Sequence, residues 1–173
     1  MGSGKTTVGQ MLARQMGWHF VDLDAVIEAR SGLSIPGIFE RLGEPGFREL
    51  EQDVLLRALG EAAALERPTV VALGGGTFAQ PQSVAALRTA GCAVIWLHCP
   101  IDELLARCAT ITNRPLFRDE KSFRQLYEQR LPFYEQADFR VDAAAEPRRV
   151  VEQILALMHV ESLGFAQENK ESA

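Results

Sequence analysis

The stretch Gly2-Ser3-Gly4-Lys5-Thr6-Thr7, which a helical pattern of apolar residues follows, constrains this chain more than any other feature. It matches the second half of the Walker A motif, G-x-x-x-x-G-K-[ST], in which glycines let backbone N–H groups surround phosphate oxygens. The motif's lysine neutralises phosphate charge, and its Ser or Thr hydroxyl binds Mg²⁺. A flexible Gly-Ser-Gly linker is the alternative, but the helical pattern that ends at Gly17 disfavours it. These six residues are therefore predicted to bind nucleotide phosphates, and Thr6 is also a candidate metal ligand.

The leading glycine of the motif, and the strand that delivers the loop, would both lie before Met1. In α/β proteins with such a loop, this strand lies inside the sheet. Five buried apolar residues contribute about 7–15 kcal/mol, at roughly 1.5–3 kcal/mol each. That gain is comparable to the whole stability of a typical domain. We therefore expect the native chain to begin upstream, with a short strand that ends in Gly-x.

Apolar runs alternate with helical patterns along the chain, which predicts an α/β fold of three layers with a parallel sheet. Strands are expected at residues 18–23, 69–73, 92–98 and 138–141. Helices are expected over residues 8–16, 25–30, 35–42, 46–65, 81–89, from 101, over 121–136, and from Pro147. The length of 173 residues suits one domain at 1–160. A polar tail at 161–173 is expected to be frayed.

The composition excludes several classes of protein. With 23 acidic and 18 basic residues and a net charge of −5, the chain lacks the basic surface of a general nucleic-acid binder. It has no apolar run near the roughly 18–20 residues that cross a bilayer, and no signal-peptide pattern. Three cysteines without CxxC spacing support neither a disulfide framework nor a zinc site. We expect a reduced, cytoplasmic domain without nucleic-acid or membrane partners.

Two carboxylates, Asp22 and Asp24, follow the first predicted strand. At positions i and i+2 they are expected on the same side of an extended segment, at the strand end where ligands bind in open α/β sheets. Because the strand at 69–73 ends in Gly74 rather than in an aspartate, Asp22 is the natural carboxylate for Mg²⁺. Asp24 is the candidate acceptor of a proton from an attacking hydroxyl. The alternative is that Asp24 only caps the next helix.

Fifteen of the eighteen basic residues are arginines, and most of them are expected on the surface. Four stand out by their sequence context: Arg48, Arg107, Arg114 and Arg130. On an acidic protein such residues are significant only if folding gathers them around a negative ligand. A planar guanidinium pairs well with a carboxylate or a phosphate, so an anionic substrate is indicated.

Taken in order with Gly74-Gly75-Gly76, Arg114-Pro115-Leu116 and Arg130-x-x-x-Tyr134, these motifs resemble those of shikimate kinases. The resemblance runs from residue 1 to about residue 158. It implies a P-loop kinase with a five-stranded parallel sheet, whose first strand is absent from this chain. It further implies a substrate-binding subdomain at about 25–55 and a mobile lid at about 110–120, for which a plain surface loop is the alternative. The implied reaction moves the γ-phosphoryl group of ATP to the 3-hydroxyl of shikimate.

The resemblance also implies roles for single residues. Lys5 and Thr6 serve phosphate and Mg²⁺, with Asp22 as a metal-linked carboxylate and Asp24 as the base. Arg48 and Arg130 grip the shikimate carboxylate, while three glycines bring backbone N–H groups against the ring: Gly74, Gly75 and Gly76. Two more arginines serve ATP: Arg114 reaches the transferring phosphate from the lid, and Arg107 lies against adenine with the loop before Pro147. ATP and shikimate are the implied partners of a monomer.

Two other functions remain open at this point. A gluconate-kinase-like enzyme would keep the phosphate loop and the lid, but would not need the pair Arg48 and Arg130 for a carboxylate. A non-catalytic, truncated nucleotide-binding protein is favoured only by the incomplete Walker A motif. The presence of Asp24, Arg48, Arg114 and Arg130 counts against it.

Overall fold

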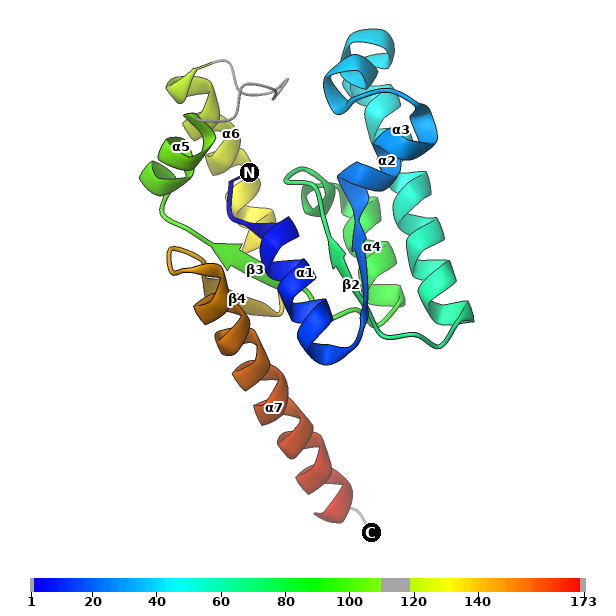
Figure 1. Cartoon of the computed structure of the whole chain (residues 1–173), viewed down its shortest axis with the longest axis vertical. Helices are drawn as coiled ribbons and strands as arrows, with labels where there is room; N and C mark the ends of the chain where they lie inside the picture. Colours follow the sequence, from blue (N-terminus) through cyan, green and yellow to red (C-terminus); the bar gives the residue numbers. More distant parts are fainter. Residues whose placement is uncertain (1, 110–118, 172–173) are drawn as a thin grey trace.

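The computed structural model describes residues 2–109 and 119–171 (Figure 1). The helices are α1 (Lys5–Met16), α2 (Leu23–Ser31), α3 (Ile35–Ala64), α4 (Pro81–Thr89), α5 (Ile101–Ala109), α6 (Glu120–Tyr134) and α7 (Pro147–Glu171). A short 3₁₀ helix, η1, spans Thr77–Ala79. The strands are β1 (His19–Asp22), β2 (Thr69–Ala72), β3 (Ile95–His98) and β4 (Phe139–Asp142). Among the described residues, no helix has both the length and the apolar character that crossing a membrane requires.

The described strands form two parallel pairs. β1 pairs with β2, so that His19 lies opposite Thr69, and β3 pairs with β4, so that Ile95 lies opposite Phe139. Helices connect the paired strands, as parallel pairing requires. The predicted parallel α/β fold is confirmed. In the described part of the chain, however, the expected single sheet is two separate pairs, β1–β2 and β3–β4.

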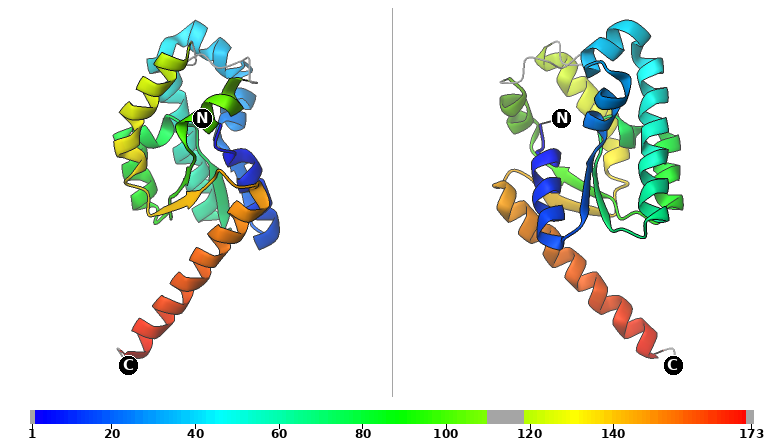
Figure 2. Two further views of the ribbon diagram at one scale, coloured as in Figure 1. Left: turned by 90° about the vertical axis from the view of Figure 1, so that its left-hand side faces the viewer. Right: turned by 45° about the vertical axis from the view of Figure 1, so that its right-hand side comes forward.

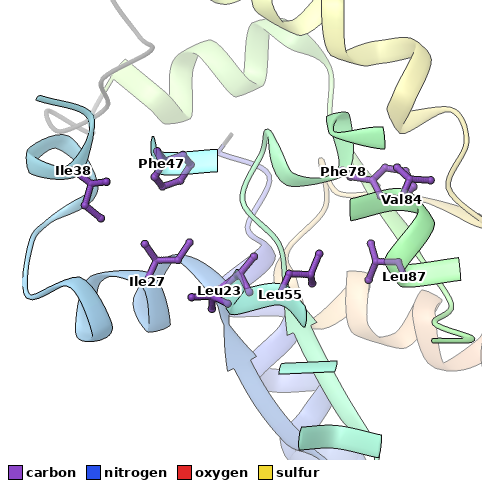
Figure 3. Packing of buried hydrophobic residues seen from close by; sticks show 9 residues of the cluster. Leu23, Ile27, Ile38, Phe47, Leu55, Phe78, Val84 and Leu87 are labelled. Carbon is purple, nitrogen blue, oxygen red and sulfur yellow. The ribbon is translucent and has the colours of Figure 1, made fainter. Parts of the chain in front are cut away.

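Helices cover both faces of the strands, which gives the three predicted layers. On one face, α1 and α7 pack with Val70, Ile95 and Leu97. On the other face, α2, α3 and α4 form the largest hydrophobic cluster of the described residues (Figure 3). Val71 packs against this cluster. Neighbouring residues Val70 and Val71 thus point to opposite faces, as the period of a strand dictates.

The long helix α3 contains the two helices that the sequence predicts. They meet at Gly43, which has φ 68° and ψ −178° inside the element, two residues before Pro45. A left-handed φ is accessible to glycine at little cost. On the two sides of this kink, Ile38 and Phe47 both belong to the large cluster, which also contains Leu23 of α2 (Figure 3). The cluster thereby holds α3 against α2, whose first turn carries Asp24 and whose N-cap is Asp22.

α7 continues to Glu171 and extends away from the rest of the molecule (Figures 1 and 2). The backbone of residues 161–171 is thus helical, and fraying of this tail stays a prediction. The segment is rich in strong helix formers such as Glu, Ala, Leu and Gln, which favours continuation of the helix beyond the last core residues.

An apolar cavity of about 500 Å³ is lined by α1, β2 and β3 together. Its walls include Val8, Leu12, Val70, Ile95 and Leu97. Among the described residues, β2 pairs only with β1 and β3 only with β4, so each has one edge without a strand partner. Apolar walls combined with unpaired backbone edges suit an extended apolar segment, which would satisfy the edges by hydrogen bonding. A strand before Gly2 has this chemistry, and its presence stays a prediction.

We expect five β-branched apolar residues, added before Gly2 with a Gly-x link, to stabilise the fold. A net gain of a few kcal/mol, after the entropy cost of ordering, corresponds to a rise of about 10 °C in the midpoint of thermal unfolding. Circular dichroism measures this midpoint. A Gly-Ser extension of the same length is the control, and equal midpoints for the two extensions would contradict the prediction.

Candidate active site

The phosphate loop, residues 2–5, has the backbone conformation that an anion site needs. Gly2 and Gly4 adopt left-handed φ values of 69° and 82°, and α1 begins directly afterwards at Lys5. This arrangement presents consecutive N–H groups and the positive end of a helix to one point. The linker alternative is excluded by this conformation together with α1. A Cβ on Gly2 would lie 2.9 Å from the Sγ of Cys108, so the loop also packs closely against α5.

Thr6 and Asp22 meet where α1 begins and β1 ends. The Thr6 hydroxyl donates a hydrogen bond to Oδ2 of Asp22 at 2.6 Å. The other carboxylate oxygen of Asp22 accepts from the backbone N–H of Ala25 at 3.3 Å and caps α2. A hydroxyl and a carboxylate oxygen beside a phosphate site are the donor types that Mg²⁺ takes from proteins. The two residues therefore fit the predicted metal site.

The expectation that Asp22 and Asp24 share one side of an extended segment is wrong. β1 ends at Asp22, and Leu23, which is fully buried, and Asp24 already belong to the first turn of α2. Burial of Leu23 in the large cluster turns the chain into the helix at this point. The capping alternative for Asp24 is also wrong, because Asp22 is the cap. A carboxylate in the first helical turn is favoured by the helix dipole.

The glycine loop, residues 74–76, is in close contact with side chains from three elements. A Cβ on Gly74 would lie 2.9 Å from Oδ1 of Asp24, and a Cβ on Gly76 would lie 2.5 Å from Nη2 of Arg48. The carbonyl of Gly75 accepts a hydrogen bond from the Tyr134 hydroxyl at 2.5 Å. The loop thus joins α2, α3 and α6, and two of its positions have no room for a side chain.

Arg48 is held by two carboxylates of its own helix. Its Nη1 lies 2.6 Å from Glu51, which is 2% exposed, and its Nη2 lies 3.0 Å from Glu44, which is 53% exposed. Glu51 also accepts from the Thr77 hydroxyl at 2.6 Å, just after the glycine loop. Burial alone would lower the pKa of Arg48, but the charge and hydrogen bond of Glu51 outweigh it and raise the pKa. The guanidinium is therefore permanently charged.

Arg130 lies on α6 and is 7% exposed. Burial raises the pKa of the Tyr134 hydroxyl, one helical turn later, and the nearby positive charge of Arg130 opposes that rise. Arg130 lines the same cavity as Ser3, Lys5 and Gly75. The phosphate loop, the glycine loop and a buried arginine thus face one space.

Arg107 is fixed beside the chain that leads to α7. Its Nη1 donates to the carbonyl of Ala143 at 3.0 Å, and its Nη2 donates to that of Ala144 at 3.1 Å. Arg107 and the loop before Pro147 are thereby neighbours, as the sequence analysis expects. Arg114 and nearly all of the predicted lid lie outside the described residues.

Two further residues of the site, Glu51 and Thr77, are absent from the sequence-based assignment. The spacing of Arg48 and Glu51, i and i+3 on a helix, is a signal for an ion pair. Nothing in the sequence indicates that Thr77 donates to the same carboxylate, because the two are 26 residues apart. Tyr134 belongs to the motif Arg130-x-x-x-Tyr134, but that motif does not predict its hydrogen bond to the Gly75 carbonyl.

The fold and the site define a P-loop kinase of small molecules. A family model described as shikimate kinase matches residues 1–159. The shikimate kinase of Synechococcus elongatus is 42% identical over 163 residues, which cover 91% of this chain and 82% of that protein. The chain belongs to the shikimate kinase family, and it is an ATP-dependent kinase.

Solved structures agree with this family and separate it from the gluconate-kinase alternative. A shikimate kinase from Acinetobacter baumannii in complex with shikimate aligns with a TM-score of 0.86 at 34% identity, covering 94% of this chain and 90% of that one. A gluconokinase from Sinorhizobium meliloti aligns with a TM-score of 0.59 at 23% identity, covering 96% and 92%. The second likeness shows the fold alone.

Substitution of Glu51 tests the electrostatics of the site independently of catalysis. Glu51→Gln removes the buried charge that compensates Arg48, and we expect the free energy of unfolding to fall by about 3 kcal/mol. Urea denaturation measures this change. Glu49→Gln, at an exposed position of the same helix, is the control. Equal unfolding free energies for the two variants would show that the pair contributes nothing.

Proposed function

We propose that this chain binds ATP at the phosphate loop and shikimate at the glycine loop, and that phosphoryl transfer occurs between the two loops. The carrying observation is the glycine loop itself, which contacts Asp24, Arg48 and Tyr134 and lines one cavity with Lys5 and Arg130. Phosphoryl transfer depends mainly on positioning and charge neutralisation. Lys5 at the phosphate loop, and Arg48 and Arg130 near the glycine loop, suit two anionic substrates.

At the phosphate end, backbone N–H groups of residues 2–5 and the start of α1 receive the β- and γ-phosphates. Lys5 neutralises their charge, and Ser3 of the loop and Thr7 of α1 complete the phosphate site. Thr6 and Asp22 are proposed to hold Mg²⁺, which when bound neutralises developing phosphate charge. Their hydrogen bond of 2.6 Å places a hydroxyl and a carboxylate together and supports this pairing.

At the acceptor end, Arg48 and Arg130 are proposed to bind the substrate carboxylate. Two donors of Arg48, Nε and Nη2, are occupied by Glu44 at 3.3 and 3.0 Å. An ion pair with so exposed a carboxylate contributes little, so a substrate carboxylate can replace it. The buried pair with Glu51 then keeps the guanidinium in place during the exchange. Asp24, against Gly74, is proposed to accept the proton of the reacting hydroxyl.

The adenine is proposed to lie against Arg107 and the loop before Pro147, and two hydrogen bonds of Arg107 hold these two groups together. Arg114 is proposed to reach the transferring phosphate from the lid. A monomer is proposed as the working unit. ATP as a substrate and three free cysteines favour the cytoplasm.

Replacing the proposed base separates chemistry from binding. Asp24→Asn keeps the shape of the side chain but removes the proton acceptor, so we expect turnover to fall about 10²–10⁴-fold while shikimate affinity is largely retained. A coupled assay with ATP, Mg²⁺ and shikimate measures turnover, and calorimetry measures affinity. Asp53→Asn, at an exposed residue of α3, is the control. Undiminished turnover in Asp24→Asn would exclude this residue as the base.

Adding a methyl group to the glycine loop tests the role of Arg48. Gly76→Ala places a Cβ 2.5 Å from Nη2 of Arg48, at a φ of −103° that alanine tolerates. The guanidinium must move, and we expect the KM for shikimate to rise about tenfold or more, since a loss of about 1.4 kcal/mol is a factor of ten. Steady-state kinetics with varied shikimate measures this KM.

The matched control is Gly60→Ala on α3, where no heavy atom lies within 4 Å of the added Cβ. This variant should gain about 0.5–1 kcal/mol of stability from helix propensity and keep its KM. If both alanine variants have the KM of the unmodified chain, Arg48 does not bind the substrate.

A further inference from the structure

We infer that Tyr134 is a positioning residue that fixes the middle peptide of the glycine loop and the guanidinium of Arg130 in one arrangement. This inference rests on the proposed function, because both groups are assigned to shikimate there. Tyr134 itself has no assigned role in that proposal. Its position on α6 lets one hydroxyl reach both groups.

The carbonyl groups of the glycine loop differ in their partners. Those of Gly74 and Gly76 accept backbone hydrogen bonds within the following turn, from Thr77 at 3.2 Å and from Ala79 at 3.1 Å. The carbonyl of Gly75 instead accepts from the Tyr134 hydroxyl at 2.5 Å. The local turn thus fixes the orientation of the Gly74 and Gly76 carbonyls, whereas a side chain 59 residues away fixes that of Gly75.

This contact also orients a donor. In a trans peptide the N–H points opposite to the carbonyl, and no described peptide is cis. With the Gly75 carbonyl directed at Tyr134, the N–H of Gly76 is directed away from α6. Glycines have more backbone freedom than other residues, so the peptide between two of them needs an external contact to keep one orientation.

The same hydroxyl lies near Arg130, one helical turn earlier on α6. The hydroxyl donates to Gly75, and because a phenol can also accept, its lone pairs suit a donor such as this guanidinium. Burial raises the pKa of Tyr134 despite the opposing charge of Arg130, so the phenol keeps the proton that it donates. The ring is held from the other side by Trp96 of β3, with ring centroids 5.9 Å apart.

The test is Tyr134→Phe, which keeps the ring against Trp96 and removes only the hydroxyl. We expect shikimate to bind about tenfold more weakly by calorimetry, the effect of losing the hydrogen bond that holds the Gly75 carbonyl. The KM for shikimate should rise by a similar factor, whereas the KM for ATP and the midpoint of thermal unfolding should stay near those of the unmodified chain. A purely structural role would lower the midpoint without separating the two KM values.

The matched control is Tyr127→Phe, also on α6 and lining the same cavity, whose hydroxyl makes no hydrogen bond among the described residues. Unchanged shikimate binding in Tyr134→Phe, with normal binding by the unmodified chain, would overturn the inference and leave the proposed function intact. Equal losses in the two variants would also overturn it. Failure of the unmodified chain to bind shikimate would overturn the proposed function, and this inference with it.

Discussion

The absence of side chains at the glycine loop is the constraint on which the acceptor end of the site depends. Asp24 and Arg48 come from two different helices, and both occupy space that a Cβ at Gly74 or Gly76 would fill. The contacts are under 3 Å, shorter than real Cβ atoms tolerate. Asp24 and Arg48 can thus approach the loop this closely only because it carries no side chains at Gly74 and Gly76. The positions of Asp24 and Arg48 therefore depend on glycine at residues 74 and 76.

Burial and ion pairing explain how a chain of net negative charge keeps cationic side chains at this site. The net charge is −5, yet Arg48 and Arg130 are almost fully buried, and Lys5 faces the same cavity as Arg130. Buried charge is costly unless it is paired, and among the ion pairs of the described residues only that of Arg48 with Glu51 has a buried carboxylate. Glu51 therefore makes a buried arginine possible. The exposed Glu44 leaves part of that arginine available for exchange.

Elements that depend on residues close in the sequence are predictable from it, whereas contacts between distant residues are seen only in the tertiary structure. The phosphate loop, α1, the four strands and the two halves of α3 follow from glycine positions and apolar periodicity. The position of Asp24 does not, because burial of Leu23 ends β1 earlier than the apolar run suggests. The shared hydrogen bonds of Glu51 with Thr77, and of Tyr134 with Gly75, join residues 26 and 59 positions apart. No sequence spacing encodes such pairs.

The two ends of the site rest on different supports. The acceptor end is held by the largest hydrophobic cluster, which α2, α3 and α4 share. The phosphate end is held by α1, through close packing of Gly9 on Phe20, the Thr6–Asp22 hydrogen bond and the contact of Gly2 with Cys108. The adjacent edges of β2 and β3 lack strand partners among the described residues, and they line an apolar cavity. Regions with fewer buried contacts open locally at lower free energy. The phosphate loop is therefore the part of the site whose order depends most on what fills that cavity.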